Sequence, residues 1–202
     1  MSKYSLVLLG LLLGLGGCAP AIQFSEVSAK IADFHPKSIV VLPFTNSVGM
    51  ENANDLTNQK MVQVLTDTNF FSRIVPPGDV KALMLRAPAA IDVITRYRST
   101  WIATGTAEPK ISAWLGKAFN VDSIVFGEVT AWSESANMSH HIYDAGLALR
   151  WVDAASGEPL WKASEGLEFI AGNPCIFDCS SASKIMDMCL RIVMDNWPGM
   201  KK

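Results

Sequence analysis

Apolar residues along the chain form short continuous runs and helical stripes, separated by polar turn residues. Residues 39–44 are a largely β-branched run that is apolar on both faces and ends before Asn46, which predicts a strand inside a sheet. Further strands are predicted at residues 70–75, 121–129, 141–152 and 160–169. Residues 153–158 separate the last two, with Gly157 at the position that favours a positive φ, and this turn predicts a hairpin.

Helical spacing of apolar residues predicts helices among these strands. Residues 52–69 carry an apolar stripe, and Asp79 is placed to cap a short helix after the second strand. A helix at residues 109–119 is expected to bury one side, formed by Ile111, Trp114, Leu115 and Ala118. The order of elements predicts an α/β fold, in which one domain packs a mixed β-sheet with helices.

Two segments depart from a simple amphipathic pattern. Residues 88–107 are irregular and hold the chain's one local concentration of basic and aromatic side chains, at Arg96, Tyr97, Arg98 and Trp101. Residues 180–197 predict a helix whose apolar stripe is wider than packing on one sheet requires. Either this helix faces a neighbouring subunit, or its own domain covers it thoroughly.

The beginning of the chain has the pattern of an export signal. One positive charge at Lys3, about ten apolar residues and a small-residue exit are typical of a secretory signal peptide, and the run is too short to span a bilayer. Residues 15–18, Leu-Gly-Gly-Cys, resemble a bacterial lipobox. In such a lipoprotein the Cys18 thiol receives a diacylglycerol, the chain is cut before it, and the new amine is acylated, commonly with palmitate.

The lipobox divides the chain into three parts. Residues 1–17 are predicted to be the signal peptide, residues 18–36 a lipidated tether whose end can pair with the body, and residues 37–202 the α/β domain. Two or three acyl chains make such anchoring effectively permanent. Ala19 follows the cysteine, so the inner-membrane retention signal of the enterobacterial kind is absent from that position.

Composition and charge narrow the function classes. Of the 202 residues, 50% are hydrophobic and 18% are charged, with a mean hydropathy of +0.23 and a net charge of −2. Loss of Lys3 with the signal peptide would leave 16 basic against 19 acidic side chains. With no positive excess to neutralise phosphates, nucleic acid is not expected as a partner.

The remaining cysteines suggest oxidation rather than metal binding. Cys175 and Cys179 lie in one loop before the last helix, and an exported chain meets an oxidising compartment, so a disulfide between them is predicted. Cys189 falls on the apolar stripe and is expected to be a buried free thiol. Three thiols with the distant His140 and His141 make a poor zinc site, and no metal or other cofactor is predicted.

Catalytic motifs are weak. Ser181 and Lys184 have the S-x-x-K spacing of serine acyl enzymes, but the partner motifs are missing and both suit an ordinary helix start. No glycine-rich phosphate-binding motif occurs, and no carboxylate pair identifies itself as an acid/base couple. Trp132, Trp151 and Trp161 lie on or beside strands, where they either line a carbohydrate-stacking surface or pack in the core or at an interface.

Three segments together resemble one lipoprotein superfamily. They are residues 38–46 with a Pro-Phe-Thr-Asn turn, residues 121–129 with a Gly-Glu-Val ending, and the hairpin at residues 149–161. In this order, behind a lipobox, they resemble the CsgG/PelC-like superfamily of bacterial outer-membrane lipoproteins, whose α/β fold is related to the TolB amino-terminal domain. The resemblance covers roughly residues 37–197.

The resemblance implies a non-enzymatic protein, anchored in the outer membrane and facing the periplasm, in machinery that assembles or exports polysaccharide or fibres. Several members form rings, so a homo-oligomer or an envelope complex is expected. This chain is shorter than CsgG and lacks an obvious alternating pattern for a pore barrel, which favours an accessory or scaffold role.

Two other functions stay open. A lipoprotein regulator of a cell-wall synthase needs a long linker across the periplasm, whereas residues 19–36 extend to only about 60 Å. An enzyme acting on an envelope polymer rests only on Ser181, Lys184 and the tryptophans.

Overall fold

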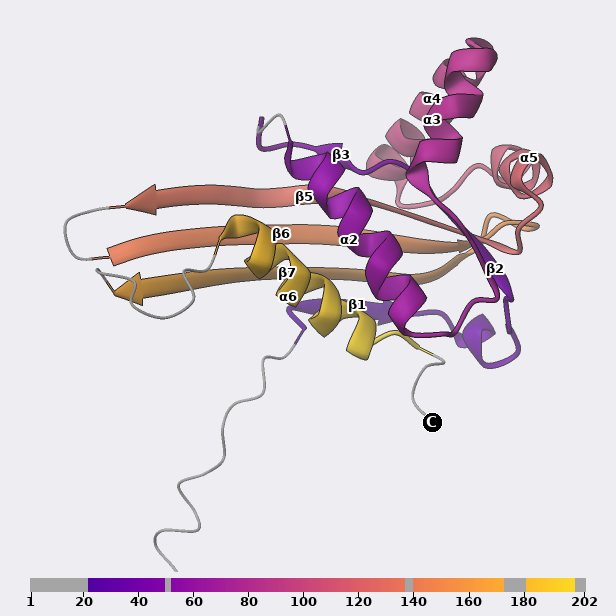
Figure 1. Cartoon of the computed structure of the whole chain (residues 1–202). Coiled ribbons are helices and arrows are strands. Elements are labelled where there is room, and N and C mark those ends of the chain that lie inside the picture. Colours follow the sequence, from indigo (N-terminus) through magenta and orange to yellow (C-terminus); the bar gives the residue numbers. More distant parts are fainter. Residues whose placement is uncertain (1–21, 50–51, 137–139, 173–180, 199–202) are drawn as a thin grey trace, which may run out of the picture.

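The structure, a computed structural model, describes residues 22–49, 52–136, 140–172 and 181–198. Its strands are β1 (Phe24–Val27), β2 (Ser38–Val41), β3 (Thr45–Asn46), β4 (Arg73–Val75), β5 (Ser123–Ala136), β6 (His140–Asp153) and β7 (Pro159–Gly172). Its helices are the 3-10 helix η1 (Ala29–Ala32), α2 (Ala53–Asp67), α3 (Pro77–Arg86), α4 (Ala89–Thr104), α5 (Pro109–Phe119) and α6 (Ala182–Asp195). Figure 1 shows their arrangement.

All the described strands belong to one mixed sheet. The strand order is β1-β7-β6-β5-β2-β4, and the short β3 pairs with the continuation of β5. β2 runs parallel to β4 and β5, whereas β5, β6, β7 and β1 follow one another antiparallel. Because helices lie on both faces of this sheet, the predicted single-domain α/β fold class is confirmed.

β2 is the interior strand that its composition predicts. All four of its residues are buried, and Ile39 and Val41 point to one core while Val40 points to the other. The strand is shorter than the apolar run because Pro43, which has no N–H, cannot continue the ladder. Asn58 of α2 compensates for this break by accepting a 2.9 Å hydrogen bond from the backbone N–H of Phe44.

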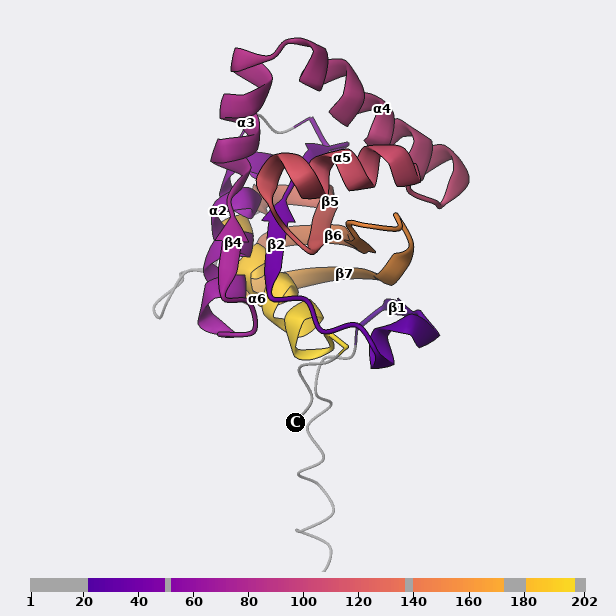
Figure 2. The ribbon, with the colours of Figure 1, turned by 90° about the vertical axis from the view of Figure 1, so that its right-hand side faces the viewer.

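The sheet has a separate hydrophobic core on each face. α2 and α6 cover one face, and α3, α4 and α5 cover the other (Figure 2). In the first core the ring of Trp197 lies 4.4 Å from Trp151 and 4.9 Å from Trp161, measured between centroids. In the second core the rings of Tyr97 and Trp101 each pack edge-on to Phe126 at 5.5 Å.

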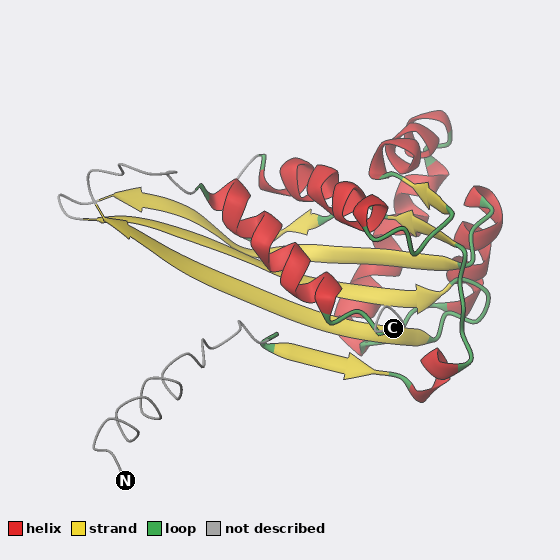
Figure 3. Ribbon diagram, turned by 60° about the horizontal axis from the view of Figure 1, so that its bottom comes forward, coloured by secondary structure: helices red, strands yellow, loops and turns green. Residues whose placement is uncertain are grey.

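β5, β6 and β7 form the longest part of the sheet. Each strand has 14 residues, which corresponds to about 45 Å. Their outer ends run past both helical layers, as Figure 3 shows. On this three-stranded projection Phe169 and Ile170 remain 38% and 54% exposed.

The segment at residues 88–107, predicted to be irregular, is the helix α4. Its buried residues are Ala90, Ile94, Tyr97 and Trp101, spaced four, three and four apart as one face of a helix requires. The prediction was wrong because bulky aromatic residues and threonines weaken the helical signal, while tertiary packing of that narrow face decides the structure.

Two helix details also differ from the prediction. Asp79 does not cap α3, because the helix already begins at Pro77, which places Asp79 in the first turn. The bounds of α5 agree with the prediction, but it buries Ser112 and Phe119 with Ile111 and Leu115. Its Trp114 and Ala118 face solvent.

α6 is covered by its own domain. Its buried residues are Ala182, Ile185, Met186, Cys189, Leu190, Val193 and Met194. It packs on β6 and β7 on one side and on α2 on the other, and of its large apolar side chains only Met188 is strongly exposed. The second explanation for its wide apolar stripe is therefore confirmed, and α6 supplies no exposed subunit interface.

Candidate functional site

The predicted site residues fall in different parts of the chain. Cys18, Cys175 and Cys179 lie outside the described residues, so their lipidation and pairing stay predictions. Cys189 is a free thiol with no exposed surface, as expected. Its Sγ lies 3.3 Å from the carbonyl oxygen of Ala145, and burial raises its pKa to about 12, so this thiol is unreactive at neutral pH.

The end of the predicted tether is part of the sheet. β1 adds to the edge of β7, with Phe24 opposite Ser164 and Val27 opposite Trp161, so the predicted pairing with the body is confirmed. The indole N–H of Trp161 donates a 2.8 Å hydrogen bond to the hydroxyl of Ser25. The segment before β2 is thus attached to the rest of the domain through β1.

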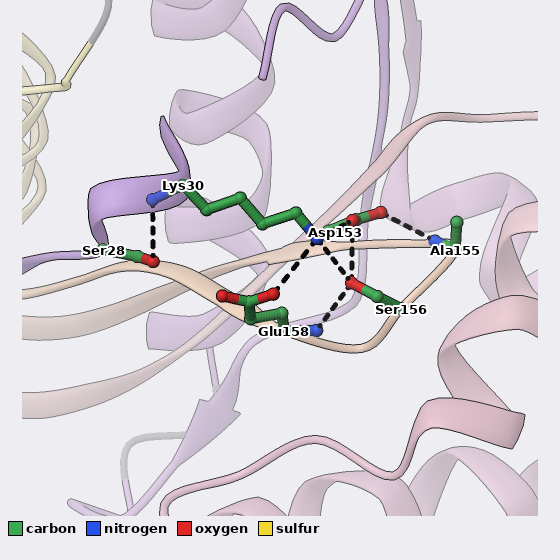
Figure 4. A network of polar contacts seen from close by, with 6 residues as sticks. All are labelled: Ser28, Lys30, Asp153, Ala155, Ser156 and Glu158. Atoms are coloured by element: carbon green, nitrogen blue, oxygen red, sulfur yellow. Dashed lines mark hydrogen bonds and ion pairs between the residues drawn. The ribbon is translucent and has the colours of Figure 1, made fainter. Parts of the chain in front are cut away.

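A polar network fastens η1 to the hairpin between β6 and β7 (Figure 4). The Lys30 ammonium lies 2.7 Å from a carboxylate oxygen of Asp153 and 3.1 Å from one of Glu158. The Ser156 hydroxyl donates to the same Asp153 oxygen at 2.7 Å, and the N–H of Ala155 donates to the other at 2.8 Å. Each carboxylate oxygen of Asp153 therefore has a donor.

These contacts shift the ionisation of both main partners. Burial acts to raise the pKa of Asp153, but hydrogen bonds from Lys30, Ser156 and the Ala155 N–H outweigh it and hold that pKa below its usual value. The hydrogen bond to Asp153 raises the pKa of Lys30. The network joins one ammonium to two carboxylates, and both oxygens of Asp153 have donors within the chain, which is the character of a structural cluster.

The weak catalytic candidates have structural roles. The Ser181 side chain accepts a hydrogen bond from the backbone N–H of Lys184 at 3.3 Å, which is an ordinary helix cap. Trp151 and Trp161 are fully buried in the core, so they cannot form a carbohydrate-stacking surface, and Trp132 packs partly buried against the same core. The explanation by core packing is confirmed for this set.

The segments that carry the family resemblance meet at one point of the sheet. A Cβ at Gly127 would lie 2.6 Å from the ring of Phe44, 2.8 Å from the side chain of Leu149 and 2.5 Å from the carbonyl oxygen of Ala148. Only glycine fits there, because these contacts would force the strands apart. At this point the motifs therefore allow the strands to approach closely.

A small pocket lies between the second half of α4 and the strands β5 and β6. Two guanidinium groups, one carboxylate and an aromatic wall line it, supplied by Arg98, Arg150, Glu128, Trp101 and Phe126. Its interior holds about 40 Å³, room for about three water molecules or one small anionic group. The sequence signal for this site was the basic and aromatic cluster around Arg98.

Both arginines of the pocket are poorly paired. A terminal nitrogen of Arg98 donates to the carbonyl oxygen of Pro43, but its buried Nε–H has no partner among the described residues. Arg150 donates one 2.7 Å hydrogen bond, to the carbonyl oxygen of its neighbour Leu149. Burial lowers the pKa of Arg98 to about 10. Burial also lowers the pKa of Arg150, and the nearby carboxylate of Glu128 partly offsets this second shift.

Other site types have no support in the described part of the chain. No cluster of three or more His, Cys, Asp or Glu side chains in these residues could hold a metal ion. None of the helices described has both the length and the apolarity needed to cross a bilayer.

Solved structures of bacterial proteins share the fold of this chain. The lipoprotein GNA1162 from Neisseria meningitidis has a TM-score of 0.56 and 18% identity, over 80% of this chain and 97% of that one. The PelC dodecamer from Paraburkholderia phytofirmans has a TM-score of 0.51 and 13% identity, over 85% of this chain and 91% of that one. The fold is shared with both. No protein-family model matches the sequence, and no curated protein has significant similarity to it.

Proposed function

We propose that the chain is an outer-membrane lipoprotein, anchored through Cys18 and facing the periplasm. It acts without catalysis, as an accessory or scaffold subunit of an envelope system that assembles or exports polysaccharide or fibres. The observation that carries this proposal is the fold, which matches nearly the whole length of a bacterial lipoprotein and of PelC. The lipobox at residues 15–18 supplies the means of anchoring.

The position of β1 supports a role close to the membrane. Only five residues separate Cys18 from Phe24, the first residue of β1. At about 3.4 Å per residue, the anchored cysteine lies no more than about 20 Å from the sheet. A lipidated Cys18 would therefore hold the domain against the membrane surface.

Open sheet edges support assembly into an oligomer or a complex. β1 and β4 are the terminal strands of the described sheet, and an edge strand presents unpaired backbone donors and acceptors. All four residues of β1 are exposed, with Phe24 at 47% and Val27 at 49%. The related fold of PelC occurs as a dodecamer. We infer that this chain also functions with other subunits.

The alternative is a lipoprotein regulator that binds a cell-wall synthase or another periplasmic partner. Pairing of β1 with β7 takes the end of the tether into the fold, so the free reach is shorter than the 19–36 segment alone would give. A regulator of this length would act only on a partner domain near its own membrane. This favours the scaffold function.

Palmitate labelling in cells tests the anchor. Wild-type protein is expected to incorporate tritiated palmitate and to sediment with the outer membrane, and Cys18→Ala is expected to lose both properties. Cys189→Ala is the matched control and should keep the label, because that thiol is buried in α6. Label retained by the Cys18→Ala protein would contradict the anchoring proposal.

Light scattering of the detergent-solubilised full chain tests assembly. The expected result is a mass several times that of one subunit, or a crosslinked envelope complex. A monomer that captures a cell-wall synthase in crosslinking would instead support the regulator. A monomer with no envelope partner would remove the scaffold proposal.

The predicted disulfide has a simple thiol count as its test. With Cys18 lipidated and Cys175 paired with Cys179, the unfolded mature chain should expose one reactive thiol, that of Cys189. Titration in denaturant without reductant checks this, and three thiols would show that the pair is reduced.

A further inference from the structure

The pocket between α4 and the strands β5 and β6 is lined by two positively charged side chains and one negatively charged side chain. Arg98 and Arg150 both line it, and neither forms an ion pair within 4.0 Å among the described residues. Glu128 is the carboxylate of the lining. A guanidinium has five N–H donors, and the structure assigns one protein acceptor to each of these two groups.

The Nε–H of Arg98 distinguishes this side chain from an exposed arginine that water solvates. That nitrogen is buried and has no partner among the described residues. A buried donor without an acceptor is costly and in folded proteins is normally satisfied by water or an ion. Arg96, two residues earlier on the same helix, is by contrast 63% exposed at its side chain and pairs with Glu108 at 3.4 Å.

We propose that this pocket binds the carboxylate group of a small anionic ligand. The planar guanidinium fork matches two carboxylate oxygens, and such charge-assisted hydrogen bonds are stronger than neutral ones. Two arginines and Glu128 leave one net positive charge, which a single carboxylate neutralises. A phosphate dianion would reverse the charge of the pocket, so the charge balance favours a carboxylate.

The pocket suits a ligand that places only its anionic group inside and leaves the rest of the molecule at the entrance. The interior, about 40 Å³, accommodates the anionic group alone. Ile102 at the rim is 69% exposed, and the ammonium of Lys162, 5.9 Å from the ring centroid of Trp101, is paired with Glu26 at 3.2 Å, so this pair adds no net charge beside the pocket. The exposed apolar side chain at the rim suits an acid with an apolar part next to its carboxylate. This inference does not depend on the anchoring or assembly proposed above.

Ligand-observed NMR titration of the full chain in non-ionic detergent and low-chloride buffer tests the site. The probes are acetate, D-glucuronate, D-glucose and inorganic phosphate at pH 8. Acetate is expected to bind saturably in the millimolar range, more tightly than phosphate, and D-glucose is expected not to bind. Binding of D-glucuronate would identify a sugar acid as an acceptable ligand, whereas binding of acetate alone would restrict the site to smaller or non-sugar acids.

Three substitutions assign the binding to this pocket. Arg150→Gln is expected to weaken acetate binding at least tenfold, and Arg98→Gln should do the same provided that its circular dichroism shows a folded chain. Glu128→Gln removes the competing carboxylate and should tighten binding several-fold. Arg96→Gln, on the exposed side of α4, is the matched control and should leave the affinity unchanged.

The outcomes that overturn the proposal are specific. No saturable acetate binding up to 100-fold above the expected millimolar range would remove the site. Unchanged affinity in both Arg150→Gln and Glu128→Gln would place any binding elsewhere. Tighter binding of phosphate than of acetate would show that the pocket is not selective for a carboxylate.

Discussion

Two partly buried charged clusters of this domain differ in how completely their polar groups are hydrogen-bonded. Around Asp153, one ammonium meets two carboxylates, and a hydroxyl and a backbone N–H also donate to the Asp153 carboxylate. Around Arg98, two guanidinium groups face one carboxylate, and a buried Nε–H has no described partner. The first cluster joins η1 to a hairpin, and the second lines an open pocket.

The difference separates a structural cluster from a candidate binding site. Buried charges are costly unless they are paired, and a satisfied network fixes the elements that contribute to it. An unsatisfied cluster stabilises the fold little and gains its missing partner only from outside the chain. Mutation should therefore lower the free energy of unfolding much more at the Asp153 cluster than at the Arg98 cluster.

The largest expected effect is at the hydrogen-bonded cluster around Asp153. Asp153→Ala removes the acceptor of three donors and leaves the Lys30 ammonium with Glu158 and the Ser156 hydroxyl, so we expect a loss of about 2–3 kcal/mol in the free energy of unfolding. Urea unfolding of the full chain in detergent, followed by circular dichroism, measures it. A loss below about 1 kcal/mol would show that the cluster does not hold η1 in place.

Acid should remove part of the same stabilisation. Because the folded-state pKa of Asp153 is depressed below its ordinary value of 3.8, its contribution is present above pH 3.8 and is lost as the pH falls through the folded pKa. The difference in melting temperature between wild type and Asp153→Asn should therefore shrink from pH 6 to pH 3. A difference that is constant over this range would mean that the carboxylate charge contributes nothing.

The incompletely hydrogen-bonded cluster around Arg98 should tolerate loss of one of its charges. Arg98→Met keeps the aliphatic stem and removes a buried, unpaired cation together with one hydrogen bond to Pro43. These effects oppose each other, so the free energy of unfolding should stay within about 1 kcal/mol of wild type. Arg96→Met, at an exposed position of the same helix, serves as the control. A loss above about 2 kcal/mol for Arg98→Met would make this arginine structural.

Much of the fold could be predicted from local patterns. β2 is a continuous apolar run because both of its faces are buried, and the hairpin between β6 and β7 follows from Gly157, whose φ is +73°. The helix α4 escaped prediction because its buried face is narrow and includes a tyrosine and a tryptophan. The lengths of β5, β6 and β7 were underestimated, since their outer ends lack a one-sided core that would impose alternation.

The pocket could be predicted only in part. The basic and aromatic cluster near Arg98 was visible in the sequence, but its second arginine, Arg150, comes from a strand 52 positions later. Their meeting depends on how α4 crosses the sheet, which no local pattern encodes. The same holds for Asp153 and Lys30, whose pairing requires β1 to return the amino-terminal segment to the hairpin.

The smallest effect is expected at an exposed ion pair, which serves as a reference for the two partly buried clusters. Lys81 and Asp55 form a 2.7 Å ion pair whose side chains are 51% and 55% exposed, so water and salt screen it. Lys81→Met should change the free energy of unfolding by less than about 0.5 kcal/mol, and raising the salt concentration should reduce even that difference. The pair is as short as the contact between Lys30 and Asp153. An effect at Lys81 as large as that of Asp153→Ala would show that distance, and not burial with complete hydrogen bonding, sets the strength of these contacts.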